Sequence, residues 1–164
     1  MEAPEWRTVW RFIAGRPRPR LRVVGIAVAA VLAGSLVFVA GLPVGLYEFG
    51  GWTVFALVLG VVAGVRTAGL VPTVGSLWLV ALWGYVFPPL VGYFTGQWEP
   101  ASRYAHPRMM GVAHRSAFGD LRHGVETATE FGLLAAVVLG ILTYLAGAGL
   151  RWLTDRFSSE SEAR

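Results

Sequence analysis

The stretch VVGIAVAAVLAGSLVFVAGLPVGLY, from Val23 to Tyr47, carries no charged residue and decides the fold class of this chain. The hydrocarbon core of a membrane is about 30 Å thick and takes roughly 20 helical residues to cross. The same length fits the uncharged run from Phe131 to Leu150, and the run between Glu48 and Glu99 holds Arg66 as its only charge. The sequence therefore predicts an all-α integral membrane protein.

The composition agrees with a membrane protein and excludes several kinds of chemistry. Charged residues make up 15% of the chain and the mean hydropathy is +0.56, whereas soluble domains carry about 25% charged residues. The sequence has no Cys, no Lys and no Asn. These absences exclude disulfides, thiolate metal sites, Schiff-base chemistry and the lysine-containing phosphate loop. We expect no cofactor and no nucleic-acid partner.

Apolar segments predict a bundle of four transmembrane helices within a membrane domain at 23–150, after a segment at 1–22 and before a polar tail at 151–164. The predicted spans lie at about 23–46, 51–70, 76–94 and 127–150, with an outer loop at 96–126. Pro72 is expected in a tight turn between spans two and three. The Pro88-Pro89 pair is expected to kink or end span three, because proline lacks the helical N–H donor.

The N-terminal segment predicts an amphipathic helix over residues 2–14. Its apolar residues recur at helical spacing on one face, namely Trp6, Val9, Trp10 and Ile13. Tryptophans beside arginines favour a helix that lies in the membrane interface, and packing on a partner's soluble domain is the alternative. Pro17 and Pro19 alternate with arginines over Arg16–Arg22, so this stretch is expected to be extended.

The arginines predict the orientation. Ten of the 14 fall on one side of a four-span topology: six in the N-terminal segment, Arg66, and three in the tail. Positive residues are enriched on the cytoplasmic side, so both termini are expected in the cytoplasm, in a plasma membrane protein. Aromatic residues gather near the expected interfaces, at Tyr47, Trp52, Tyr93 and Trp98 outside and at Trp6, Trp10 and Trp152 inside.

The outer loop at 96–126 predicts an amphipathic helix on the outer leaflet, beginning at Pro107. One helical face is apolar, with Met110, Ala113, Ala117, Phe118, Leu121 and Val125. Arginines recur every seven residues on the opposite face, at Arg108, Arg115 and Arg122. Because guanidinium groups match phosphate geometry, these arginines with His123 are predicted to bind an anionic ligand or lipid headgroup.

Two further patterns have a structural and a functional interpretation. His123, Glu126 and Glu130 share a broad helical face that could hold a divalent metal, but such a face is more often a solvated one paired with arginine. Gly60 and Gly64 are spaced so that two helices approach closely. That contact lies either within one bundle or between two chains.

The sparse polarity of the spans predicts a non-enzymatic accessory or assembly component that packs with itself or with another membrane protein. An ion-coupled carrier needs titratable groups within its spans, and here the spans carry mainly hydroxyls. One alternative is a subunit of an oligomeric channel or transporter. The other is an outer-face membrane enzyme that binds metal or phosphate.

Overall fold

The computed structural model of the protein describes residues 5–46, 49–99, 102–105 and 116–162, and every regular element in these ranges is helical. The α-helices are α1 (Glu5–Ala14), α2 (Pro17–Val39), α3 (Gly51–Val65), α4 (Leu70–Thr95), α5 (Ala117–Thr127) and α6 (Leu133–Glu162). A π-helical turn, η1 (Ala128–Gly132), joins α5 to α6.

Three helical stretches are long and apolar enough to cross a membrane: Phe12–Val39, Leu70–Thr95 and Ala117–Ser158. This finding confirms the expectation of long apolar helices of membrane type. The fourth apolar helix, α3, has 15 residues. It rises only about 22 Å, against a hydrocarbon core of about 30 Å. It ends at Val65, short of the predicted boundary at residue 70.

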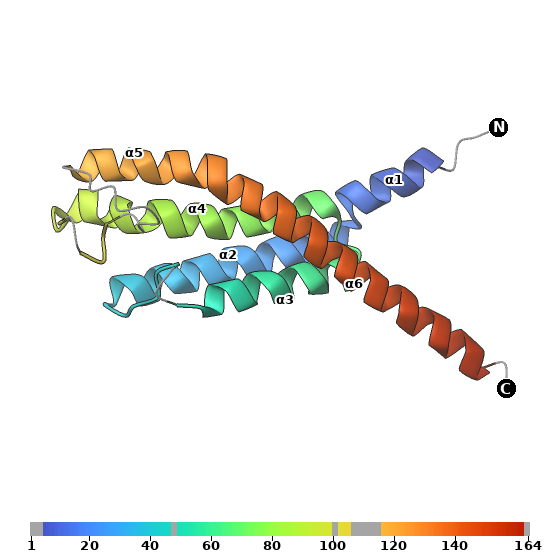
Figure 1. Ribbon diagram of the computed structural model, residues 1–164. Helices are drawn as coiled ribbons and strands as arrows, with labels where there is room; N and C mark the ends of the chain where they lie inside the picture. Colours follow the sequence, from blue (N-terminus) through green and yellow to red (C-terminus); the bar gives the residue numbers. More distant parts are fainter. Residues whose placement is uncertain (1–4, 47–48, 100–101, 106–115, 163–164) are drawn as a thin grey trace.

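The helices form an elongated bundle in which successive long helices run in opposite directions (Figure 1). Helix α4 is central, because it contacts all the other helices of the described chain. Helix α3 packs mainly on α6. Both ends of the chain lie at the same end of the bundle, where α1 and the last part of α6 project beyond the other helices (Figure 1).

The prolines near the N-terminus begin α2, so the expectation of an extended stretch there was wrong. Helix α2 starts at Pro17, directly after Arg16 in extended conformation. The first turn of a helix has no intrahelical partner for its N–H groups, and the fixed φ of proline suits it. Helix α2 ends at Val39, before the predicted 46, and the following chain turns back so that Trp52 Nε1 donates to the Val44 carbonyl at 2.8 Å.

Prolines also sit inside α4 without ending it. Helix α4 begins at Leu70 after Gly69, so Pro72 lies in its first turn and not in the predicted connection. Pro88 and Pro89 are both buried, and α4 continues through them to Thr95. Prolines are tolerated in membrane helices where neighbouring helices surround the affected turn, and α2, α5 and η1 all contact α4.

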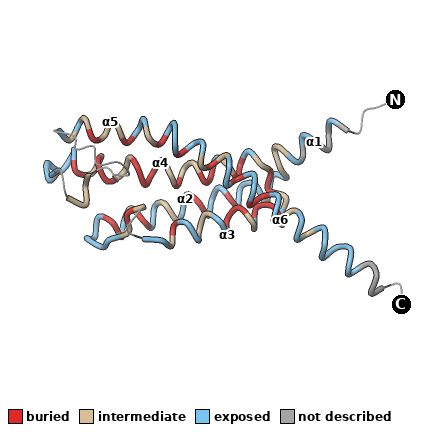
Figure 2. Tube along the Cα trace, in the orientation of Figure 1, coloured by how far each residue is buried: buried red, intermediate tan, exposed pale blue. Residues whose placement is uncertain are grey.

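Figure 2 shows the buried stretches of the bundle in red, and Trp52 and Trp83 are among the buried residues. The rings of Trp52 and Trp83 lie 4.7 Å apart between centroids. Trp83 Nε1 donates to Ser35 Oγ at 2.8 Å, and Trp78 Nε1 donates to the Ala128 carbonyl at 2.9 Å. A buried indole N–H needs an acceptor in an apolar medium, and these bonds fix how α2, α4 and η1 meet.

The α1–α2 and α3–α4 connections meet at two glycines, at the end of the bundle that holds both termini. Gly15, between α1 and α2, has φ +74°, and Gly69, between α3 and α4, has φ +96°. A Cβ on either glycine would overlap backbone atoms of the other connection. The Arg16 N–H also donates to the Thr67 carbonyl at 3.2 Å. We call this contact between Gly15 and Gly69 the glycine junction.

Candidate functional site

Helix α5 carries the described part of the predicted outer-loop helix. The side chain of Ser116 accepts a hydrogen bond from the Gly119 N–H at 3.1 Å and so caps its start. Residues 117–127 then continue without a break through η1 into α6, and they pack along α4. They therefore form the N-terminal part of the last long helix. A separate helix on the outer leaflet was predicted here. Arg108 and Arg115 lie outside the described residues.

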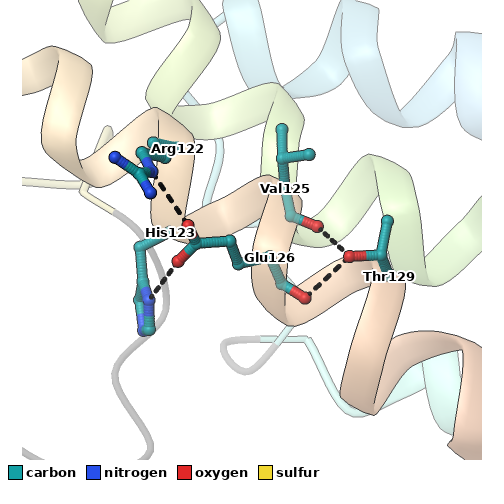
Figure 3. A network of polar contacts seen from close by, with 5 residues as sticks. All are labelled: Arg122, His123, Val125, Glu126 and Thr129. Carbon is teal, nitrogen blue, oxygen red and sulfur yellow. Dashed lines mark hydrogen bonds and ion pairs between the residues drawn. The ribbon is translucent and has the colours of Figure 1, made fainter.

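The predicted binding residues of α5 form an exposed ion-paired group (Figure 3). Arg122 Nε lies 2.9 Å from Glu126 Oε1, and His123 Nδ1 lies 3.8 Å from Glu126 Oε2. The hydrogen bond from Arg122 lowers the pKa of Glu126 below its ordinary value. Because the side chains of Arg122 and Glu126 are 74% and 48% exposed, the pair resembles a solvated charged face.

The third weak metal candidate, Glu130, lies exposed in η1, one residue beyond the hydroxyl of Thr129. Across residues 5–46, 49–99, 102–105 and 116–162, no group of three His, Cys, Asp or Glu side chains could hold a metal ion. His106 and His114 fall outside these ranges, so the structure does not place them relative to His123.

The π-helical turn gathers side-chain hydrogen bonds that no sequence pattern predicted. Thr129 Oγ1 donates to the carbonyls of Val125 and Glu126, both at 2.9 Å (Figure 3). Trp78, from α4, donates to the carbonyl of Ala128. A π-helical turn disrupts the regular ladder of backbone bonds, and these donors satisfy carbonyls next to and within it.

Arg103 makes several contacts at the end of the bundle opposite both termini, and sequence reasoning did not select it. Its Nη2 donates to the carbonyl of Phe38 in the last turn of α2. Its guanidinium carbon lies 4.4 Å from the ring centroid of Phe38 and 5.2 Å from that of Tyr104. Cations are favoured at helix C-termini and over aromatic rings, so Arg103 fastens the loop to α2.

A second pair fastens the same loop to α5. Trp98 Nε1 donates to Asp120 Oδ2 at 2.9 Å, and Asp120 is 2% exposed. A Cβ on Gly92 of α4 would press on the side chains of Trp98 and Tyr104. The loop therefore binds the ends of three helices together, which gives it a structural role in the bundle.

Gly60 and Gly64 lie against α6 of the same chain. A Cβ on Gly60 would overlap the side chain of Thr143, and one on Gly64 would overlap the carbonyl oxygen of Tyr144. On the opposing helix, Gly147 faces the backbone of Val61 in the same way. This reciprocal contact brings the backbones of α3 and α6 together.

The bundle has an open pocket between its helices, but few reactive groups line it. A cavity of about 330 Å³ lies between α3, α4 and the η1–α6 segment, and its lining is mostly apolar, with Thr53 and Tyr85 among its few polar residues. Buried hydroxyls elsewhere bond to the carbonyl four residues back in their own helix, as Thr73, Ser76 and Thr143 do. These hydroxyls serve helix geometry, and no set of them converges on the cavity.

Comparison with known proteins adds no relative to this description. The chain matches no family model, no curated protein and no solved structure.

Proposed function

We propose that the protein is a four-span plasma membrane protein with both termini in the cytoplasm, and that it serves as a non-enzymatic accessory or assembly component. In this proposal α3, extended by its flanking connections, is the short second span. Arg16 and Arg66 lie at the end of the bundle from which both termini leave, and the positive-inside tendency supports a cytoplasmic location for that end.

The N-terminal helix supports the same placement. Trp6, Val9 and Trp10 of α1 are 62%, 57% and 60% exposed, although they belong to its apolar face. Phe12, on another side of α1, packs edge-on against Tyr144 with ring centroids 5.2 Å apart. An amphipathic helix tied to the bundle and exposing two tryptophans fits the membrane interface.

The observation that carries the assembly role is the outward face of α2. The face toward the bundle holds the buried residues Val23, Ala27, Gly34 and Phe38. The opposite face is exposed and carries Gly25, Ala29, Leu32 and Leu36, which follow one another at spacings of four, three and four residues. A Cβ on Gly25 would meet no atom within 4 Å. We call this opposite set the outer face of α2.

Such a face suits a second transmembrane helix. Lipid tails are as apolar as leucine, so helices associate in membranes through close backbone approach at small residues. Glycines inside the bundle, such as Gly60, Gly64 and Gly147, are already closed by contacts within the chain, whereas Gly25 stands open beside the exposed leucines of α2. The outer face of α2 is thus available for another copy or for another membrane protein.

The test compares two substitutions at open helical glycines. Gly25→Leu changes the outer face of α2, and Gly75→Leu makes the same change in α4, where a Cβ would also meet nothing within 4 Å. Each variant is purified in mild detergent with differently tagged copies, and its oligomeric mass and co-purifying membrane proteins are measured. We expect Gly25→Leu to abolish an association that Gly75→Leu retains. A wild-type protein that is strictly monomeric and partnerless would refute the proposal.

A further inference from the structure

A groove between α2 and α3 opens near the end of the bundle that holds both termini. It has a volume of about 250 Å³ and is lined by Pro19, Arg22, Val23, Ile26, Val62 and Arg66. The four residues from α2 follow one another at helical spacing, so they form one face of that helix. The contact between α2 and α3 is the smallest of the helix–helix contacts in the described chain. The two helices therefore leave an open groove between them.

The groove combines an apolar floor with a cationic rim. Val23, Ile26 and Val62 supply aliphatic surface, and Arg22 and Arg66 supply two exposed guanidinium groups. Neither arginine forms an ion pair with any described residue.

The surrounding sequence does not neutralise these arginines. Between Trp6 and Trp98 the only acidic residue is Glu48, which follows the far end of α2. Three more arginines lie close by. Arg16 and Arg18 line an adjoining pocket, which shares Pro19 and Arg22 with the groove. Arg20 lies in α2 between Arg18 and Arg22 in the sequence. The positive charge at this end of α2 therefore favours the binding of an anion.

We infer that this groove binds an anionic phospholipid. The phosphate would lie between Arg22 and Arg66, because guanidinium groups pair with phosphate oxygens in fixed geometry. One acyl chain would follow Val23, Ile26 and Val62 toward the membrane interior. The charge of the rim selects an anionic headgroup, and the apolar floor selects a lipid over a soluble phosphate. The inference needs only the membrane location of the chain and is independent of its role in assembly.

The test measures lipid binding to the purified full-length protein. Delipidated protein in neutral detergent is titrated with phosphatidylglycerol or with phosphatidylcholine, and bound lipid is counted by native mass spectrometry. We expect the wild type to prefer phosphatidylglycerol. Each arginine near a membrane surface strengthens anionic lipid binding by roughly fivefold, so the double variant Arg22→Gln/Arg66→Gln is expected to weaken it by roughly 30-fold.

The matched control removes two arginines from the same end of the bundle. Arg151→Gln/Arg156→Gln changes the charge equally, but Arg151 already pairs with Asp155 at 3.5 Å and Arg156 lies 5.5 Å from the ring centroid of Trp152. We expect this control to bind phosphatidylglycerol as the wild type does. The variant Arg22→Lys/Arg66→Lys keeps the charge but loses the guanidinium geometry, so its affinity for phosphatidylglycerol should lie between those of the wild type and the glutamine double. This order separates loss of binding from loss of folding.

A third variant tests the groove itself. Val62→Trp fills the apolar floor and leaves both arginines in place, so it should also weaken phosphatidylglycerol binding if an acyl chain lies there. Equal affinity of the wild type for the two lipids would overturn the inference. So would an equal loss of binding in the two arginine-to-glutamine doubles, or full binding by a folded Val62→Trp variant.

Discussion

The contact between α3 and α6 predicts opposite effects for the same substitution at two neighbouring glycines of α6. A Cβ on Gly147 would meet the carbonyl group of Val61 and the amide nitrogen of Val65, all of them backbone atoms of α3. A Cβ on Gly149 would meet nothing within 4 Å. Backbone atoms cannot rotate out of the way as a side chain can, so Gly147→Ala forces the two helices apart.

The magnitudes follow from two opposing effects. Alanine is favoured over glycine inside a helix by about 1 kcal/mol, so Gly149→Ala is expected to stabilise the protein by about that amount. Overpacking in a close contact costs about 3 kcal/mol at the upper end of its range, and the same helical preference reduces the net cost of Gly147→Ala to about 2 kcal/mol. The two variants should differ by about 3 kcal/mol, or roughly a hundredfold in the unfolding constant.

Reversible unfolding in detergent measures this difference. Wild type and both variants are titrated with a denaturing detergent, and helix content and tryptophan fluorescence are followed together. Equal shifts for Gly147→Ala and Gly149→Ala would refute the packing described here, because intrinsic helix preference alone treats the two sites alike. Stabilisation by Gly147→Ala would refute it as well.

Three further changes test the end of the bundle opposite both termini. Arg103→Gln should destabilise the protein by about 1–3 kcal/mol in the same assay, because a carbonyl at the end of α2 loses a charged donor. Trp98→Phe should cost about 1–3 kcal/mol, since it removes the indole donor to the buried carboxylate of Asp120. Arg122 lowers the pKa of Glu126 from its ordinary 4.5. The ionised carboxylate therefore contributes its full stability above the ordinary pKa, and this contribution is lost as the pH falls through the lowered pKa. Comparing the unfolding of Glu126→Gln and wild type between about pH 6 and about pH 3 measures the loss.

Each of these changes has an outcome that contradicts it. A fully stable Arg103→Gln variant would mean that the loop is held without its guanidinium. If Trp98→Phe unfolds like the wild type, the hydrogen bond to Asp120 contributes nothing. If stability falls equally steeply with decreasing pH in Glu126→Gln and in wild type, the exposed pair with Arg122 is screened by solvent.

The long apolar helices could be predicted from the sequence because length and charge depletion alone determine whether a helix can cross a membrane. The ends of the helices could not be predicted in the same way. Pro17 and Pro72 read as breaks along the chain, yet both lie in first helical turns, where proline is well suited. Helix α3 ends in a capping turn at Thr67, whose φ is +56°, and the Ala68 N–H donates to the Ala63 carbonyl at 2.9 Å. The chain therefore turns before the apolar run is exhausted.

The loop at 96–126 drew attention in the sequence, but the residues that hold its described part to the bundle were not selected. Periodicity drew attention to Arg122 and its exposed neighbours, since helical spacing can be counted in a sequence. Arg103 and Trp98 act through partners 65 and 22 residues away. Such pairings depend on how the helices pack, and no local pattern in the sequence announces them.

The glycine junction has a consequence for the order in which the chain is made. Gly15 leaves the ribosome long before Gly69, so the two backbones can meet only after α3 and the turn that follows it have been made. Until then the direction of α1 is not set by the rest of the protein. A nascent chain halted after α2 would carry its N-terminal tryptophan helix untethered, and completion of the α3–α4 turn is the first step that ties it to the rest of the protein.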